Sequence, residues 1–266
     1  LHKIIKSVLK SGNYVGGNQT KIFEKNISNY CGKKYCVSLN SGTDALTFAL
    51  YCLGVKKGDE VIVPAFTWIS TANVVEHQGA KPVFCDINLD TFNIDTTKIE
   101  ELVTDKTVGI IPVHLFGLAA DMDAILDLAK KYNLWVIEDA ACGFGAIYKG
   151  KHVGSFGDAG VFSFHPRKSI TTGEGGMVTS NHMDLLERIQ QLRDHGAVLS
   201  DLQRHLGAKP YLLSDHIHAG YNQRMTDIQG ALGAAQMERA KEIILERRGI
   251  AKSFDTAFAD LDGFHK

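Results

Sequence analysis

The chain has 266 residues, 44% of them hydrophobic and 22% charged, which is ordinary composition for a soluble globular protein. A net charge of −1 gives no general basic field for nucleic acid, and no apolar run is long enough to cross a bilayer. The five cysteines form no CxxC pair, and cysteine and histidine never fall at the spacing of zinc ligands, so no metal site is expected. Their odd, unpatterned number indicates reduced thiols and a cytoplasmic location.

The N-terminal residues predict two helices before the first strand. The apolar residues of segment 1–10 recur at helical spacing. A loop rich in glycine and asparagine, residues 11–18, then leads into a second helix that carries Ile22, Phe23 and Ile27 on one face.

From residue 35 onward, short apolar segments alternate with helical patterns. Strands that alternate with helices and are apolar throughout indicate an α/β fold with a mostly parallel central sheet covered by helices. Long helices are expected near the end of the chain, over residues 182–194 and 226–249. The earlier expected strands are 35–39, 61–63, 83–86, 108–114 and 134–137, and the earlier expected helices are 43–53, 68–78, 96–103 and 121–131.

The ends of these strands give the candidate site residues. In an open α/β sheet the ligand binds at the carboxyl ends of the strands, where loops lead into helix N-termini. The residues in such positions are 40–43, 64–68, Asp86, His114, Glu138, Asp139 and the loop that carries Lys168.

Lys168 lies in a polar turn between two apolar runs, residues 159–164 and 177–179, and beside the glycine-rich segment 173–176. Glycine has no Cβ, so the backbone of this predicted strand–turn–strand unit can approach a ligand closely. A solvated lysine in a hairpin turn is the plain alternative, and other features of the chain decide between the two.

Three such features occur at other strand ends. Ser41, Gly42 and Thr43 open a helix whose free N–H groups form an anion site, although a plain capped helix has the same pattern. Asp139 ends an apolar strand, where a carboxylate needs a cation or donors, or acts as a cap. Trp68 could cover a flat ring or pack in the core. Pyridoxal phosphate (PLP) requires an anion site for its phosphate, a carboxylate for its ring nitrogen and a lysine to bind it covalently. The helix N-terminus, Asp139 and Lys168 together match these requirements, and Trp68 could cover the ring.

Several segments in the same order give the chain a family resemblance. The sequence resembles the DegT/DnrJ/EryC1/StrS family of sugar aminotransferases, which implies the aspartate-aminotransferase type of fold (PLP-dependent transferase fold type I). Residues 1–240 then correspond to the large PLP-binding domain, and residues 241–266 to the start of a small C-terminal domain that is expected to continue beyond Lys266. The segments are SLNSGTDAL, DEVIVPAFTWISTANVV, PVFCDI, IPVHLFGLAADMD, VIEDAACGFGA, SFHPRKSITTGEGGM and GYNQRMTDIQGALG.

The resemblance also implies a role for individual residues. Lys168 looks like the lysine that binds PLP covalently, and Asp139 like the partner of its pyridine nitrogen. Cys142 stands where the family usually has Gln or His against the ring hydroxyl, so that contact is expected to be weak or replaced by water. Further implied cofactor contacts are Gly42, Thr43 and Ser163 at the phosphate, Trp68 on the ring, and Asn222 reaching the cofactor of the neighbouring subunit in a homodimer with shared active sites. His165, Glu174 and His195 are expected near the substrate, with purely structural roles as the alternative.

The resemblance implies transfer of an amino group from glutamate to a nucleotide-linked 4-keto-6-deoxy sugar for surface polysaccharide or glycan synthesis, with PLP cycling through pyridoxamine phosphate. Residues 170–176 read ITTGEGG, as in family members that aminate C4, whereas members that act on C3 tend to carry an aspartate in this loop. The alternatives are a 3-keto-sugar aminotransferase, a PLP-dependent sugar dehydratase and a non-catalytic regulatory homologue. Lys168 argues against the dehydratase, because the family's dehydratases have histidine at this position.

Overall fold

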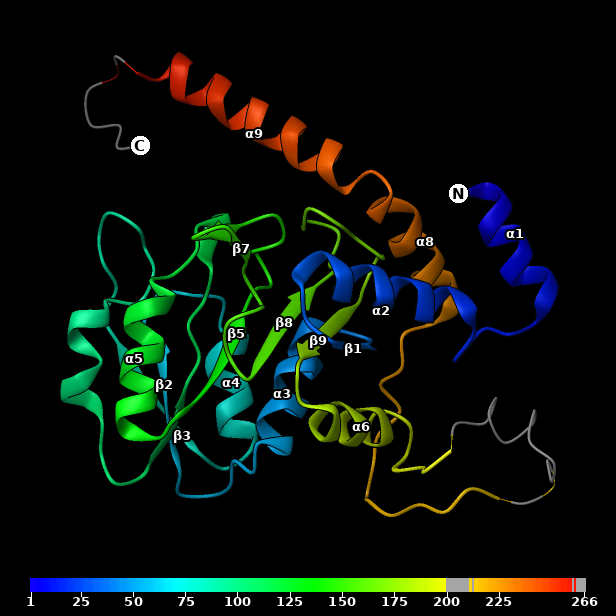
Figure 1. Cartoon of the computed structure of the whole chain (residues 1–266), viewed down its shortest axis with the longest axis horizontal. Helices are drawn as coiled ribbons and strands as arrows, with labels where there is room; N and C mark the ends of the chain where they lie inside the picture. The colour runs from blue at the N-terminus through cyan, green and yellow to red at the C-terminus, as the bar shows by residue number, and fades with distance from the viewer. Residues whose placement is uncertain (200–210, 212, 260, 262–266) are drawn as a thin grey trace.

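A central seven-stranded sheet organises the fold (Figure 1). The structure is a computed structural model and describes residues 1–199, 211, 213–259 and 261. The strand order across the sheet is β1-β9-β8-β5-β4-β2-β3, and β6 and β7 form a separate two-stranded ribbon. The strands are β1 (Tyr35–Leu39), β2 (Glu60–Pro64), β3 (Lys81–Cys85), β4 (Thr107–Ile110), β5 (Trp135–Asp139), β6 (Ile147–Tyr148), β7 (Lys151–His152), β8 (Ala159–Ser163) and β9 (Gly176–Ser180).

The expected, mostly parallel sheet is confirmed, with β9 as the exception. Strands β2, β3, β4, β5 and β8 pair in parallel, whereas β9 is antiparallel to both β8 and β1. No helix connects β8 to β9, and the chain turns back through the loop that holds Lys168 until Gly176 pairs with Ser163. The strand–turn–strand prediction for this loop is therefore confirmed.

The strand predicted over residues 108–114 ends earlier than expected. β4 stops at Ile110, because Pro112 has no N–H to continue the ladder. Pro112 still accepts a hydrogen bond from the N–H of Asp139 (2.9 Å), and Val113 forms an isolated bridge with the same residue. The segment after β4 thus remains bonded to the end of β5.

Helices cover both faces of the sheet. The helices of the described chain are α1 (His2–Ser11), α2 (Asn18–Cys31), α3 (Gly42–Cys52), α4 (Ser70–His77), α5 (Met122–Tyr132), α6 (Met183–Leu192), α8 (Asp227–Met237) and α9 (Ala240–Ala257), with short 3₁₀ turns η1 (Thr96–Lys98), η2 (Glu100–Leu102) and η3 (Leu115–Gly117). Of these, α1 and α9 lie away from the sheet (Figure 1). In the described part of the chain, no helix combines the length and the apolarity needed to span a membrane.

Two helix predictions are wrong in detail. The helix expected over 96–103 is instead η1 and η2, which the fully buried Ile99 anchors between them. The single helix expected over 226–249 is broken between α8 and α9, where Arg239 leaves the helical region (φ −108°, ψ 9°) and the buried Ala240 restarts the helix. The start of α8 is well defined by a capping box between Thr226 and Gln229.

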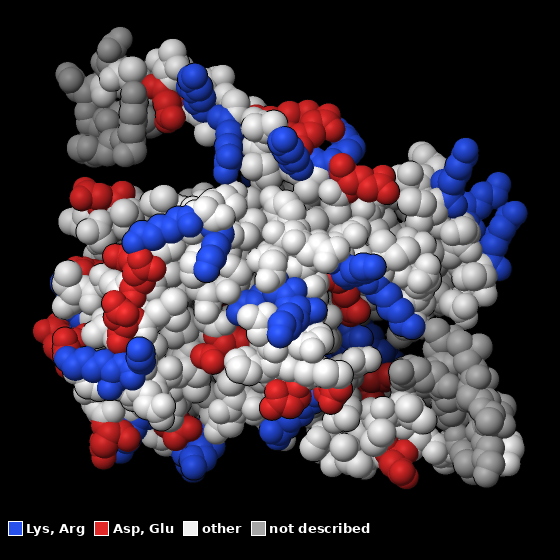
Figure 2. All heavy atoms as spheres, in the orientation of Figure 1, with Lys and Arg blue, Asp and Glu red and all other residues white. Residues whose placement is uncertain are grey.

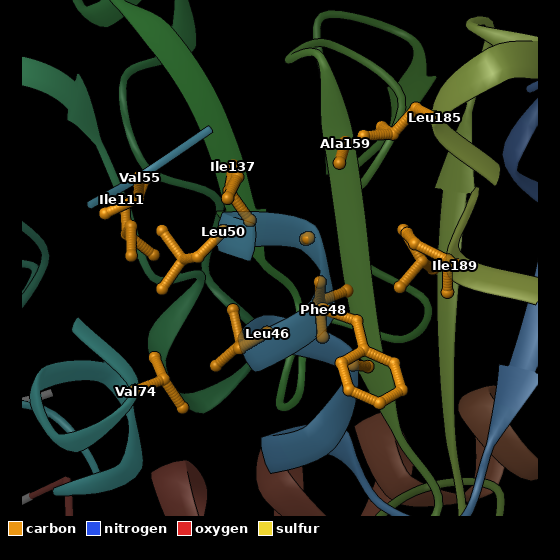
Figure 3. Packing of buried hydrophobic residues seen from close by; sticks show 14 of the residues in the cluster. Leu46, Phe48, Leu50, Val55, Val74, Ile111, Ile137, Ala159, Leu185 and Ile189 are labelled. Atoms are coloured by element: carbon orange, nitrogen blue, oxygen red, sulfur yellow. The ribbon is translucent and has the colours of Figure 1, made fainter. Parts of the chain in front are cut away.

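Successive side chains of β5 enter the core on opposite faces of the sheet. Ile137 packs with residues of α3, α4 and α6 on one face of the sheet (Figure 3), whereas Val136 packs with residues of α5 on the other. Because side chains alternate along a strand, Asp139 belongs to the face of Ile137 and Glu138 to the face of Val136. Two adjacent acids therefore enter different environments.

The outer surface of the described chain is mixed in charge. Figure 2 shows basic and acidic side chains interspersed over the visible face, so neither sign dominates there. Figure 1 shows α9 lying along the outside of the body, and Leu245, Ile250 and Phe254 of this helix are each more than half exposed.

Candidate active site

The candidate site lies at the carboxyl ends of β5 and β8, beside the first residues of α3 and α4. Asp139 is the last residue of β5, Ser163 is the last residue of β8, and Lys168 follows in the β8–β9 loop. Gly42 is the first residue of α3. The expected positions of Asp139 and Gly42 at the end of a strand and the start of a helix are therefore confirmed, and ligand binding there stays a prediction.

Asp139 is a buried carboxylate with two neutral donors. The residue is 5% exposed, and its Oδ2 accepts a hydrogen bond from the Thr71 hydroxyl (2.9 Å) while Oδ1 accepts one from the Ala141 N–H (3.1 Å). Burial raises the pKa of Asp139 above its usual value, although these hydrogen bonds and the charge of Lys168 act in the opposite direction. The carboxylate is thus not fully compensated, and an additional cation beside it would stabilise its charged form.

Lys168 places an ammonium group in the same site. Its Nζ donates to the sulfur of Cys142 (3.0 Å), and its backbone N–H donates to the His165 carbonyl (2.9 Å). The loop around it is folded back on itself, because the N–H of Thr172 donates to the Phe164 carbonyl (3.0 Å). Lys168 is half-buried, so it is neither a freely solvated turn lysine nor a core residue.

Cys142 contacts the lysine in this structure. The sequence predicts a weak contact from this thiol to a ring hydroxyl, and that contact stays a prediction. Burial raises the pKa of the other four thiols, to about 12 for Cys52 and about 11 for Cys85, and also for Cys31 and Cys36. In the part of the chain that is described, all five cysteines are free thiols.

We expect Cys142 to be the most reactive of the five thiols in the cofactor-free protein. A cation beside a sulfur makes a thiol more reactive, whereas burial suppresses reaction at the other four. Peptide mapping after brief iodoacetamide treatment should find alkylation at Cys142 about tenfold faster than at Cys52 or Cys85. PLP added beforehand should slow the reaction at Cys142 alone. Faster alkylation of any other cysteine would contradict this placement of the thiol.

The residues expected to bind the phosphate lie at the start of α3 and beside it. Ser41 caps the helix by accepting a hydrogen bond from the Asp44 N–H (3.0 Å), and the N-terminal N–H groups of such a helix attract phosphate. Gly42 lies so close to β8 that a Cβ atom there would come within 2.8 Å of the Ser163 Cβ. The Thr43 hydroxyl lies 3.1 Å from the hydroxyl of Ser70. The three predicted phosphate residues are therefore gathered at one point.

Trp68 stands at the rim of this site. The residue is 69% exposed, so the alternative of a core aromatic is wrong. It precedes α4, whose Ser70 reaches Thr43 and whose Thr71 reaches Asp139. The indole face is thus available to a ligand that spans from the helix α3 N-terminus to the buried acid.

The predicted substrate residues divide into two groups. His165 and Glu174 face each other across the Lys168 loop, with 3.9 Å between His165 Nε2 and a Glu174 carboxylate oxygen. His195 and Asn222 lie together in another segment, where the His195 N–H donates to the Tyr221 carbonyl (2.8 Å). Both are exposed, and in the described part of this single chain neither side chain has a hydrogen bond to Lys168 or Asp139.

Sequence reasoning missed the direct partner of Asp139. Thr71 is fully buried on α4, yet the pattern of that segment contains no signal that a hydroxyl is bonded to a strand more than sixty residues away. Glu138 and His114 appear among the strand-end residues, but no role was expected for either. Asp86, from the same set, pairs with Lys98 (2.9 Å) on the surface, outside the site.

The residues present fit PLP. A helix N-terminus suits its phosphate, an exposed indole suits its ring, and a lysine is present to bind it covalently. The incompletely compensated carboxylate of Asp139 suits a protonated ring nitrogen. In the described ranges no group of three or more His, Cys, Asp or Glu side chains is placed to hold a metal ion.

Known proteins with the same fold support this assignment. A model of the DegT/DnrJ/EryC1/StrS aminotransferase family matches residues 2–266. GDP-perosamine synthase from Caulobacter vibrioides is 46% identical over 239 residues, which are 90% of this chain and 62% of that protein. An aminotransferase from Psychrobacter cryohalolentis is 39% identical with a TM-score of 0.90, over 97% of this chain and 66% of that one. The PLP form of Spr1654 from Streptococcus pneumoniae is 33% identical with a TM-score of 0.86, over 97% of this chain and 68% of that one.

The chain spans 62% to 67% of the length of four curated relatives that match it.

Proposed function

The chain belongs to the DegT/DnrJ/EryC1/StrS aminotransferase family, and we propose that the protein transfers an amino group from glutamate to a nucleotide-linked 4-keto-6-deoxy sugar, with PLP as cofactor. The observation that carries the proposal is the buried, incompletely compensated Asp139 in one site with the half-buried Lys168. The name of GDP-perosamine synthase supports a nucleotide-linked sugar, and the PLP and PMP forms of Spr1654 support the cofactor. The product would serve surface polysaccharide or glycan synthesis in the cytoplasm.

Different residues of the site would bind different parts of PLP. Gly42, Thr43 and Ser163 would hold the phosphate, Trp68 would cover the ring, and Asp139 would hold the ring nitrogen. When bound, PLP supplies an electron sink for the negative charge that develops on carbon after a proton is removed. Before the cofactor binds, the contact with Cys142 and the charge of Asp139 keep the Lys168 ammonium group in the site.

Lys168 moves the protons of the reaction. Its Nζ takes the proton from Cα of the amino donor and later delivers a proton to the sugar carbon that receives the amine. Thr71 and Ala141 keep the Asp139 carboxylate in one orientation throughout. The approach of His165 and Glu174 across the loop supports a contact of both with the sugar. We include His195, in the segment after α6, as a further substrate residue.

The position of amination follows from the loop sequence ITTGEGG at residues 170–176. A carboxylate as long as Glu174, at a glycine-flanked position, affects which sugar carbon lies over the reacting atoms. A displacement of about 1 Å can lower the rate about a hundredfold. Matched 3-keto and 4-keto nucleotide sugars should be offered to the full-length enzyme with glutamate, and the new amine located by NMR. We expect turnover of the 4-keto sugar, with the amine at C4.

An amine at C3 would instead assign the chain to the 3-keto-sugar aminotransferases. Loss of the sugar hydroxyl without incorporation of nitrogen would indicate a dehydratase. Absence of turnover with every keto sugar, in a protein that holds PLP, would favour the non-catalytic homologue. Each of these outcomes contradicts the proposed reaction.

We further propose a homodimer in which Asn222 reaches the cofactor of the partner subunit. An exposed aromatic cluster next to the site supports an apolar interface: the rings of Phe66, Phe92 and Phe116 lie 5.7 to 6.5 Å apart and are 42% to 75% exposed. We expect Asn222→Ala to weaken retention of PLP about tenfold without changing the melting temperature of the cofactor-free protein. Dialysis followed by absorption spectroscopy measures the retention. Full activity in a strictly monomeric species would contradict the shared site.

We also infer that residues 241–266 begin a second domain. Ala240 of α9 is buried, and Ile243 and Ile244 pack partly against the core. Further along the helix, Leu245, Ile250 and Phe254 are each more than half exposed, which supports contact with further protein surface. Residues 1–240 would then form the PLP-binding domain.

A further inference from the structure

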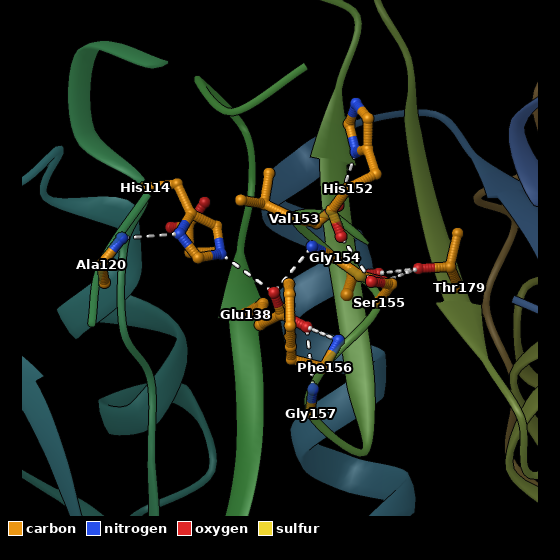
Figure 4. A network of polar contacts seen from close by, with 12 residues as sticks. His114, Ala120, Glu138, His152, Val153, Gly154, Ser155, Phe156, Gly157 and Thr179 are labelled. Atoms are coloured by element: carbon orange, nitrogen blue, oxygen red, sulfur yellow. Dashed lines mark hydrogen bonds and ion pairs between the residues drawn. The ribbon is translucent and has the colours of Figure 1, made fainter. Parts of the chain in front are cut away.

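A second buried acid, Glu138, precedes Asp139 in β5, and the alternation of side chains along a strand directs it to the opposite face of the sheet. Figure 4 shows its surroundings. Glu138 is 0% exposed, and its carboxylate points away from the site toward the loop between β7 and β8. The function proposed above assigns no role to this carboxylate. Burying a charge so close to another buried acid is costly, so its surroundings require an explanation.

Glu138 is compensated by four donors, in contrast to Asp139. One carboxylate oxygen accepts the N–H groups of Phe156 (2.6 Å) and Gly157 (2.8 Å). The other accepts the N–H of Gly154 (2.7 Å) and lies 3.0 Å from His114 Nε2. Burial by itself would raise the pKa of Glu138, but His114 and these N–H groups bring it below the usual value. Glu138 therefore remains charged without any cation from a ligand.

His114 joins this carboxylate to the backbone of Asp139. The N–H of Ala120 donates to His114 Nδ1 (3.2 Å), so the ring proton lies on Nε2 and is donated to Glu138. The backbone N–H of His114 donates to the Asp139 carbonyl (3.0 Å). Together with the bond from Asp139 N–H to Pro112, this fixes the residue from both sides.

Other titratable groups also lie around Glu138, and in the described part of the chain none of them replaces His114 as its side-chain hydrogen-bond donor. Lys33 donates from Nζ to the Gly157 carbonyl (2.8 Å), and burial lowers its pKa while Glu138 raises it. Burial lowers the pKa of His152, whose Nε2 accepts the N–H of Gly145 (3.0 Å). Burial raises the pKa of Cys31, so it adds no charge. Facing Asp139 itself are Lys168 and His114.

We propose that Glu138 and His114 are positioning residues that keep Asp139 fixed and add a second buried negative charge behind it, so that the ring nitrogen of bound PLP stays protonated. The proposal rests on the proposed function. It predicts that a change on the face away from the ligand alters the protonation of the ligand. A purely structural role for the pair would change stability only.

The test uses the full-length protein loaded with PLP. Borohydride first fixes a pyridoxyl group on the protein, and the absorption of its ring is then titrated with pH. Glu138→Gln removes the negative charge of the side chain. Its amide NH₂ group would then face N–H groups that now donate to the carboxylate. We expect the midpoint for loss of the ring-nitrogen proton to fall by about one pH unit, and to fall further in Asp139→Asn.

Glu60→Gln is the matched control. Glu60 is also buried, at 9% exposure, and accepts a hydrogen bond from the Thr104 hydroxyl (2.7 Å). It is the first residue of β2, whereas Asp139 is the last residue of β5, so the two acids lie at opposite ends of the parallel strands. This variant should titrate like the wild type. Should Glu138→Gln fail to fold, His114→Leu replaces it, because three N–H groups still hold Glu138. Loss of the His114 contact raises the pKa of Glu138 and so weakens its negative charge, and the midpoint should again fall. His114→Gln, which keeps a donor and an acceptor, should return the midpoint to the wild-type value.

The outcomes separate the two proposals. If wild-type protein forms no pyridoxyl adduct, the proposed function fails and this inference fails with it. If the adduct forms and Glu138→Gln or His114→Leu titrates at the wild-type midpoint, even with a lowered melting temperature, only this inference is overturned.

Discussion

Lys168→Ala should lower the rate of amino transfer about 10⁴-fold, the upper end of what one positioned acid–base group contributes. The reason is that the proposed function makes this Nζ both the point of covalent attachment of PLP and the group that moves the proton at Cα. The charge of Lys168 is also one of the factors that lower the pKa of Asp139, so the variant should lose part of its affinity for the cofactor. The measurement is the rate of glutamate-dependent amination of a 4-keto nucleotide sugar by the full-length enzyme.

Lys130→Ala is the control for this variant. Lys130 is an exposed lysine of α5, away from the carboxyl ends of the strands, and its removal should leave the rate within about twofold of wild type. A Lys168→Ala enzyme that keeps more than about a tenth of the wild-type rate would remove this lysine from the reaction.

Asp139→Asn should affect catalysis and stability in opposite directions. In the proposed function the Asp139 carboxylate keeps the ring nitrogen of PLP protonated. Its loss should therefore slow the half-reaction with glutamate about 10³-fold. The carboxamide fits the site, because its oxygen can accept the Ala141 N–H while the Thr71 hydroxyl rotates to accept from its NH₂. Single-turnover kinetics with glutamate measures this effect.

Without cofactor the same variant should be more stable than the wild type at neutral pH. Burial raises the pKa of Asp139 from its ordinary value of 3.8, so the folded state binds its proton more tightly than the unfolded state. The resulting destabilisation is fully present above the folded-state pKa and disappears as the pH falls below 3.8. Melting temperatures of the cofactor-free proteins across this range should therefore converge at acid pH. An Asn variant that melts below the wild type at neutral pH would show that the carboxylate is already satisfied.

The parts of the site that follow from chain topology could be predicted from the sequence. Apolar runs around Lys168 predict the β8–β9 turn, and the strand-end rule predicts that Asp139 and Gly42 lie at one edge. These inferences need only the alternation of elements and the direction of parallel strands. The reversed direction of β9 depends instead on the path of one loop.

Contacts between distant side chains could not be predicted in this way. The bond from Thr71 to Asp139 depends on how α4 packs against β5, and a buried threonine in an amphipathic segment gives no sign of its partner. The approach of Cys142 to Lys168 depends on the fold of two loops. The four donors on Glu138 come from His114 and backbone N–H groups, which carry no residue-type signal.

The most direct test of the account is to locate the lysine that binds PLP. The full-length protein should be reduced with borohydride in the presence of PLP, digested and mapped by mass spectrometry. The account predicts the pyridoxyl mass on the peptide that contains Lys168. The buried Lys33 is the informative competitor, because burial lowers its pKa and would make it chemically reactive if it were accessible. A pyridoxyl group on Lys33, or on any lysine other than Lys168, would contradict the account.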